Sequence, residues 1–113
     1  MWFKRNGNPT KSEYIFATRI INDDIGPNIG INTDGKISIY WNGPSYQQGI
    51  TSSSIYTNNQ WYNLILSVNN NNAIAYVNGV QIGTNSITKN WESSGYRLAR
   101  HLDSGGTWAN YFD

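Results

Sequence analysis

Short runs of alternating residues, separated by turn residues, restrict the fold of this chain more than any other feature. In the segment WYNLILSVN (61–69), the large apolar residues share one face: Tyr62, Leu64, Leu66 and Val68. The residues between them share the other: Trp61, Asn63, Ile65 and Ser67. A period of two is typical of a β-strand, and a slip of one residue would expose the whole apolar set. Helical periodicity is nearly absent, because Asn, Gly, Ser and Thr interrupt each candidate helix.

Two residue pairs have the composition of hairpin tips. Asp34-Gly35 lies between NIGIN (28–32) and KISIYW (36–41), and Asn78-Gly79 lies between AIAYV (73–77) and VQIG (80–83). Both pairs tolerate the positive φ angles that a type I′ turn requires. We therefore interpret Asn78-Gly79 as the tip of a hairpin and not as a ligand loop. The run of four Asn residues at 69–72 predicts a further polar turn.

The remaining segments complete an all-β pattern. EYIFATRI (13–20) predicts a strand, and a polar loop from 42 to about 59 is expected to hold a short edge strand at 53–56. Near the end, GYRLAR (95–100) is followed by a predicted loop at 101–108 and the start of a strand at 110–113. Strands at this spacing predict an antiparallel two-sheet jelly-roll sandwich, and 113 residues suit one domain over residues 1–113.

Composition excludes several classes of partner. Charged residues make up 13% of the chain and the net charge is +1, without a basic run that would neutralise phosphates, so we expect no nucleic acid. The chain has no Cys, which excludes a disulfide framework and a thiolate metal site. No apolar run approaches the ~20 residues of a membrane helix. A surface of uncharged polar residues is expected, as suits an extracellular, cell-surface or virion protein.

Several motifs in order carry a resemblance to a known family. INTDGKISIYW, TNNQWYNLILSVN, AIAYVNGVQIGT and the final YRLAR…YFD together resemble the laminin-G-like branch of the concanavalin A-like lectin/glucanase superfamily. Tyr76-Val77-Asn78-Gly79 resembles the family's YVNG hairpin, and Trp2-Phe3-Lys4 resembles the end of its first strand. The resemblance implies a jelly roll and assigns Trp2 and Trp61 to structure rather than to a ligand site.

The resemblance also implies missing edges. Members of the family usually have a strand that runs through the WFK position from further upstream, and a last strand beyond YFD. We therefore expect a domain truncated at both ends, whose open strand edges are covered by another copy or by a parent chain.

Catalysis is not expected. Glycoside hydrolysis needs two facing carboxylates, and the two Glu residues, Glu13 and Glu92, lie in unrelated segments. His101 is the single histidine, and although Asp103 and Ser104 follow it closely, a triad depends on geometry rather than proximity. One His without Cys also makes a zinc site implausible.

Calcium binding is left open. The resemblance implies it, because laminin-G-like relatives often bind calcium between rim loops, which need several oxygen ligands. Asp23 and Asp24, with Asn22 and Asn28 nearby, could supply them. The alternative is a solvated turn, because Asp and Asn bond to their own backbone there.

Carbohydrate binding remains the principal expectation. Aromatic rings stack on sugar faces while amides and Arg bond to hydroxyls, and such residues gather in predicted loops. The candidate set is Trp41, Tyr46, Trp91, Arg100, His101 and Trp108. Each Trp or Tyr has an alternative role in the core of a sandwich.

We therefore expect a non-catalytic module that recognises a glycan or a surface protein, within a larger extracellular or phage-particle protein. The alternative is a structural or assembly domain without a small ligand, and a remnant glycoside hydrolase comes third.

Overall fold

Two antiparallel sheets and a small hairpin form the domain. The computed structural model describes residues 1–7, 12–18, 26–41 and 49–87, and the main chain of 42, 47–48, 97–98, 100–102 and 108–110. The strands are β1 (Trp2–Lys4), β2 (Glu13–Ala17), β3 (Gly26–Ile31), β4 (Ile37–Asn42), β5 (Gln47–Thr51), β6 (Trp61–Asn69), β7 (Asn72–Val77), β8 (Val80–Ser86), β9 (Arg97–Leu98), β10 (Arg100–Leu102) and β11 (Trp108–Asn110). Within this part of the chain no helix has the length and apolarity needed to cross a membrane.

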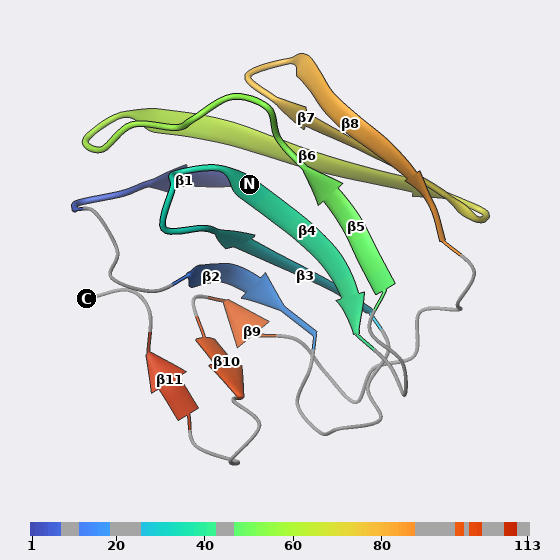
Figure 1. Ribbon diagram of the computed structural model, residues 1–113, viewed down its shortest axis with the longest axis horizontal. Helices are drawn as coiled ribbons and strands as arrows, with labels where there is room; N and C mark the ends of the chain where they lie inside the picture. The colour runs from blue at the N-terminus through green and yellow to red at the C-terminus, as the bar shows by residue number, and fades with distance from the viewer. Residues whose placement is uncertain are drawn as a thin grey trace.

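The sheets lie one over the other (Figure 1). One has the strand order β1-β6-β7-β8 and the other β5-β4-β3-β2-β9, while β10 pairs with β11. Strand β5 contacts β8 across the layers, and β10 contacts β2. The predicted all-β antiparallel sandwich is therefore confirmed.

The core lies between the inner faces of the two sheets. On β3 and β4, the register places Ile29 opposite Ile39 and Ile31 opposite Ile37, and all four side chains are buried. The β1–β6–β7–β8 sheet contributes inner side chains that alternate with outward residues, as the period of a strand requires. Those buried are Phe3, Tyr62, Leu64, Ala73, Ala75 and Val77. The alternation read from WYNLILSVN is confirmed at Tyr62 and Leu64.

The turn predictions are confirmed. Asn78 and Gly79 have φ angles of 50° and 79°, as a type I′ hairpin turn requires, and Gly35 has a φ of 82° between β3 and β4. At the β6–β7 turn, Asn69 pairs with Asn72, and Asn70 adopts a φ of 51°. The Asn-Gly pair of AYVNGVQIGT is therefore a hairpin tip.

Two strand positions differ from the sequence expectation. The edge strand expected at 53–56 lies earlier, at β5, because its position is set by pairing with β4 through Ser38–Thr51 and Ile39–Ile50. The loop expected at 101–108 is shorter, since both of its ends belong to strands: Leu102 pairs with Trp108 in the β10–β11 ladder.

Residues 52–60 form an irregular segment that is tied to the end of β1. Arg5 is buried, and its Nη1 donates to the carbonyl of Tyr56 at 3.0 Å. The amide of Asn59 donates to the Arg5 carbonyl at 2.7 Å. These bonds hold the segment over one end of the sandwich, directly before β6 begins.

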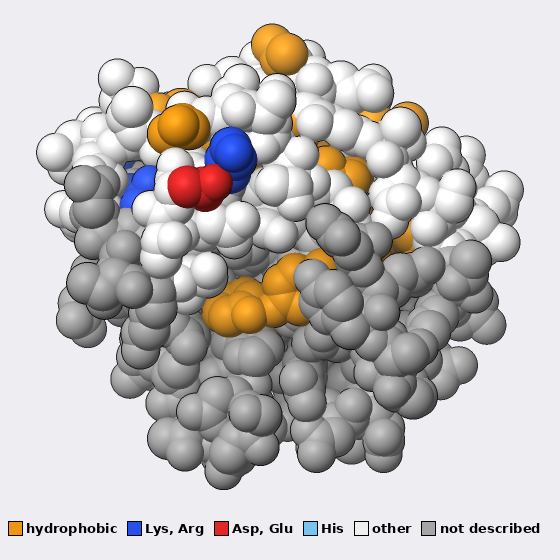
Figure 2. All heavy atoms as spheres, viewed as in Figure 1, with side chains coloured by type: hydrophobic (Ala, Val, Ile, Leu, Met, Phe, Trp, Pro, Cys, Tyr) orange, Lys and Arg blue, Asp and Glu red, His pale blue; other side chains and the backbone are white. Residues whose placement is uncertain are grey.

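The described residues carry few charges on the face seen in Figure 2. Most of their side chains there are uncharged and polar, the acidic and basic groups lie close together, and apolar side chains gather at a hollow in the middle of the view. A surface of this kind agrees with the low charged fraction of the sequence.

Candidate functional site

Two exposed tryptophans share the outer face of the β1–β6 ladder. Trp2 lies opposite Asn63 and Lys4 lies opposite Trp61, so these four residues form adjoining cross-strand pairs. Trp2 is 66% exposed and Trp61 62% exposed. Diagonal neighbours on one face of a sheet lie within reach of aromatic side chains. The arrangement therefore presents two large rings, an amide and a cation at one place on the surface.

The outward direction of the rings follows from what their neighbours bury. Phe3, between Trp2 and Lys4, points into the core and stacks on Tyr62 with ring centroids 5.4 Å apart. The Tyr62 ring also meets Tyr56 edge-on, at 5.1 Å. Because neighbouring residues of a strand point to opposite faces, burial of Phe3 and Tyr62 turns Trp2 and Trp61 outward.

Hydrogen bonds at the Tyr62 hydroxyl fix the start of β6. The hydroxyl accepts from the amide of Thr57 and donates to Oε1 of Gln60, both at 3.0 Å. The same strand end is held from the side of the hairpin tip, where Oδ1 of Asn78 accepts from the Asn63 amide at 2.8 Å. The backbone that carries Trp61 and Asn63 is thus held at several points, which favours a preformed site.

The outer face continues with apolar and polar side chains along β6, β7 and β8. Ile65 is 49% exposed and lies opposite the half-buried Tyr76, which in turn lies opposite Gln81. Among the described outward side chains of this sheet, Lys4 is the one charged group, and its Nζ lies 5.8 Å from the centre of the Trp61 ring. The face is therefore an aromatic surface with one cation, set in uncharged polar groups.

Such a surface can stack sugar rings and bond their hydroxyls. Trp and Tyr offer a large apolar face, and the apolar face of a sugar packs against it while neighbouring polar groups fix orientation. Asn63 supplies an amide of the required kind beside both rings. We call the set Trp2, Lys4, Trp61 and Asn63 the aromatic face.

Sequence reasoning assigned Trp2 and Trp61 to structure, whereas both side chains are mostly exposed and neither belongs to the core. A signal for Trp61 was present in the sequence. Its place in the alternation of WYNLILSVN puts it with Asn63 and Ser67 on the face opposite to Tyr62 and Leu64. The resemblance outweighed that pattern. Trp2 gave a weaker signal, since its orientation depends on Phe3 being the buried member of a three-residue strand.

Trp41, predicted to contact sugar, is 2% exposed and belongs to the core. It continues the inward series of Ile37 and Ile39 on β4, so its ring packs between the sheets. The prediction is therefore wrong for Trp41. Tyr46 and Trp91, from the same candidate set, lie outside the described residues.

The other three candidates come together as backbone positions. Arg100 and His101 belong to β10 and Trp108 to β11, with Arg100 opposite Asn110 and His101 opposite Ala109. The ladder thus brings the segments that carry these residues into one hairpin, although Trp108 begins a strand and does not lie in a loop. Their side chains lie outside the described residues, so a contact of these residues with a sugar stays a prediction.

The carboxylates of the described residues lie on different elements. The described carboxylates are Glu13 on β2 and Asp34 in the β3–β4 turn, where Asp34 pairs with Lys36 at 3.3 Å. Within the described residues no group of three or more His, Cys, Asp or Glu is placed to hold a metal ion. Asp23 and Asp24, the calcium candidates, lie outside the described residues.

Burial raises the pKa of the Glu13 carboxyl above its ordinary value of 4.5, and the charge of Arg5 opposes this. At Asp34 the pKa of the carboxyl shifts in the opposite direction. The Lys36 amide donates to Oδ1 at 3.1 Å and lowers the pKa of the Asp34 carboxyl, and the Lys36 side chain acts in the same direction. Neither carboxyl lies on the strands that form the aromatic face.

Comparison with known families agrees with the architecture. The family model described as the concanavalin A-like lectin/glucanases superfamily matches residues 1–113. The chain belongs to this superfamily. Neither a curated protein nor a solved structure matches the chain. Membership of the superfamily establishes the fold of this concanavalin A-like domain and places it among lectin-like and glucanase-like domains. It does not establish a ligand, which has to be argued from the residues of the domain itself.

Proposed function

We propose that this concanavalin A-like domain is a non-catalytic carbohydrate-recognition module, and that its ligand stacks on the aromatic face. The observation that carries the proposal is the exposure of Trp2 and Trp61 on neighbouring strands. Two large exposed rings on neighbouring strands lack the stabilisation that burial would give them. Contiguous exposed apolar area of this kind often marks a binding surface. Asn63 and Lys4 supply hydrogen-bond donors beside the rings.

Several features favour a sugar over other ligands. The face lies on paired strands and is open, which suits the flat face of a polysaccharide better than a small molecule that needs an enclosing pocket. It carries few charges, which argues against phosphate-rich partners. We further propose that the domain acts as part of an extracellular, cell-surface or virion protein, where such a module would attach its parent to a glycan.

The test is binding to a panel of polysaccharides, in calcium and again with a chelator, followed by intrinsic Trp fluorescence. Trp2→Ala and Trp61→Ala should each weaken binding by about tenfold or more, as loss of an aromatic contact predicts. Val80→Ala is the matched control, because Val80 is 68% exposed on the same sheet but lies outside the aromatic face. The Val80→Ala variant should bind the polysaccharide with the same affinity as the parent protein.

Other outcomes would place the function elsewhere. Binding that survives both Trp changes but is lost in Trp108→Ala would move the site to the β10–β11 hairpin. Binding that depends on calcium and on Asp23 or Asp24 would indicate a metal-organised site. No binding to any glycan would favour the structural or assembly role.

A further inference from the structure

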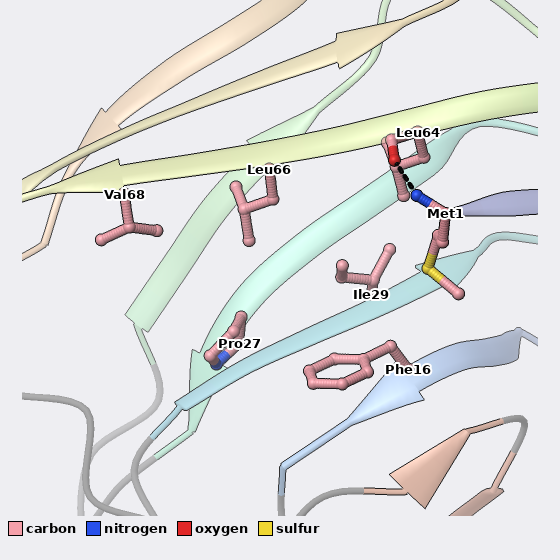
Figure 3. A pocket seen from close by; sticks show the side chains of 7 residues that line it. All are labelled: Met1, Phe16, Pro27, Ile29, Leu64, Leu66 and Val68. Carbon is pink, nitrogen blue, oxygen red and sulfur yellow. Dashed lines mark hydrogen bonds between the residues drawn. The ribbon is translucent and has the colours of Figure 1, made fainter.

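A polar cavity of about 370 Å³ lies beside the end of β1. Its wall is formed by Arg5, by residues 33–35 of the β3–β4 turn and by residues 55–58 of the irregular segment. The cavity differs from the apolar one between the sheets, where side chains of β6 project toward the other sheet (Figure 3). Small-molecule sites typically have volumes of about 300–1,000 Å³, so the polar cavity is large enough for a small ligand.

Arg5 brings an almost completely buried charge to the wall of this cavity. The residue is 3% exposed. Its Nη1 donates to the carbonyl of Tyr56 at 3.0 Å, whereas Nε and Nη2 are buried and have no hydrogen-bond partner. Buried polar groups are normally hydrogen-bonded, and buried charges are normally paired. The guanidinium therefore lacks acceptors along the edge that carries Nε and Nη2.

Neither of the described carboxylates pairs with Arg5. Asp34 lines the cavity, but its Oδ2 lies 3.3 Å from Nζ of Lys36 and its Oδ1 accepts from the Lys36 amide. Glu13 is close enough for the charge of Arg5 to lower the pKa of its carboxyl, although burial raises that pKa more strongly. Within the described residues, Lys36–Asp34 is the one ion pair. No direct contact with a carboxylate there neutralises the charge of Arg5.

Hydrogen bonds of the main chain hold the surroundings of the guanidinium in place. The Asn59 amide donates to the Arg5 carbonyl at 2.7 Å, and the Tyr56 amide donates to the Gly35 carbonyl at 2.9 Å. Gly35 also leaves room beside the guanidinium, because an added Cβ would lie only 3.3 Å from Nη1. A donor group that is fixed in this way loses little freedom when a ligand binds.

We propose that this cavity binds the carboxylate of a small ligand through Arg5. Nε and Nη2 direct parallel N–H groups along one edge of the planar guanidinium, and this fork matches the two oxygens of a carboxylate. The exposed Ile55 at the cavity offers an apolar surface to the carbon part of the ligand. Binding requires a small shift of the cavity wall, because Nε and Nη2 are covered.

The surroundings favour a carboxylate over two other kinds of ligand. The carboxyl groups of Asp34 and Glu13 lie near the guanidinium and repel a dianion such as phosphate more strongly than a monoanion. A neutral amide offers one oxygen to two donors and would leave one of them unpaired. The carboxylate itself can belong to a free organic acid or to a uronic acid unit of a glycan, since both present the same group to Arg5.

The test is heteronuclear NMR of the whole labelled chain, in which the Nε–H resonance of Arg5 is identified by its loss in Arg5→Lys. Propionate and glucuronate are the probes, and propionamide and glucose are their neutral controls. Both acids should shift the Nε–H resonance in a saturable manner, because the carboxylate accepts from that group. The neutral controls should leave it in place.

Variants give a second measurement, with the backbone amide of Gly35 as the reporter. Arg5→Lys keeps the charge but loses the fork and should weaken binding of either acid by about tenfold or more. Asp34→Asn removes a negative charge from the cavity wall and should strengthen binding by about twofold or more. The Asp34 side chain is 50% exposed, so this variant should fold even if Arg5→Lys does not. Trp61→Ala should leave propionate binding unchanged, which separates this site from the aromatic face.

The results either identify the source of the carboxylate or overturn the proposal. Tighter binding of glucuronate than of propionate would support a uronic acid of a glycan, and equal or tighter binding of propionate would support a free organic acid. The proposal fails if neither acid shifts the Arg5 resonance or if propionamide shifts it equally. It also fails if phosphate binds more tightly than both acids.

Discussion

Lys4 lies directly across the β1–β6 ladder from Trp61, and its Nζ atom is 5.8 Å from the centre of the indole ring. A cation at this distance from an aromatic face is attracted by the ring quadrupole. The contact limits the orientations of an exposed Trp and so reduces the cost of ordering it when a ligand stacks on it.

The first prediction concerns this contact. Lys4→Gln should lower the free energy of unfolding by about 0.5 kcal/mol, the value typical of an exposed cation–π pair. Lys4→Arg retains a cation and should restore most of the loss. Urea denaturation followed by circular dichroism measures both. Equal stability of Lys4→Gln and the parent protein would show that the contact contributes nothing.

The second prediction contrasts two tryptophans. Trp41→Ala should cost about 3–5 kcal/mol of stability, because it empties a fully buried site between the sheets. Trp61→Ala should change stability by no more than about 0.5 kcal/mol, since its ring is mostly in water. The two midpoints in one denaturant series check this. A large loss in Trp61→Ala would mean that the ring serves the fold rather than a ligand.

The same contrast shows how far the sequence predicts this structure. The alternation in WYNLILSVN and the two Asx-Gly turns were sufficient for β6 and for two hairpins, because these depend on side-chain period and backbone φ. Strand β5 was misplaced, since QQGIT has only Ile50 as a buried apolar residue and owes its place to pairing with β4. Tertiary pairing of this kind leaves little trace in a local pattern.

For the candidate site, the alternation of inward and outward residues along the strands predicts which Trp side chains are buried. Trp41 stands two residues after Ile39, which predicts burial, and Trp61 stands two residues before Asn63, which predicts exposure. Trp41 was instead grouped with aromatic residues of predicted loops, and Trp61 was assigned to structure by the family resemblance. Which of the outward residues meet across strands depended on the β1–β6 register, and the sequence does not contain that register in a local form.

The third prediction concerns two glycines with similar backbone angles. Gly79 has a φ of 79° and nothing lies within 4 Å of an added Cβ, whereas at Gly35, with a φ of 82°, a Cβ would lie 2.8 Å from Cγ2 of Ile55 and 3.3 Å from Nη1 of Arg5. Gly79→Ala should cost about 1–2 kcal/mol from backbone strain alone. Gly35→Ala should cost about 1 kcal/mol more, because the neighbours must also shift.

Denaturant midpoints measured together for the two glycine variants provide the comparison. Equal costs would indicate that Ile55 and Arg5 move aside freely. A smaller cost at Gly35 would contradict the packing of residues 52–60 against the β3–β4 turn.

The fourth prediction concerns stability and pH. Burial raises the pKa of Glu13, so its favourable contribution is fully present below the unfolded value of 4.5 and is lost as the pH rises through the higher folded pKa. Asp34 has a lowered pKa, so its contribution is present above 3.8 and is lost as the pH falls through the lower folded pKa.

Urea titrations between acidic and neutral pH check both signs. Glu13→Gln should reduce the decline in stability that the parent protein shows above pH 4.5, and Asp34→Asn should reduce the decline at acid pH. If Glu13→Gln instead steepened the decline toward neutral pH, attraction to Arg5 would outweigh burial.

Strand β6 has consequences for how such a domain can diversify. Its odd-numbered residues, beginning with Trp61, belong to the outer surface, and its even-numbered residues from Leu64 to Val68 line an apolar cavity between the sheets. Substitutions at odd-numbered positions leave the surface formed by the even-numbered residues largely unchanged, and the reverse also holds. A lineage could therefore change the outer surface by substitutions at odd positions while it keeps the apolar side chains between the sheets. A single-residue insertion in this strand would disturb both surfaces at once, so we expect natural length variation to be confined to the turns that flank it.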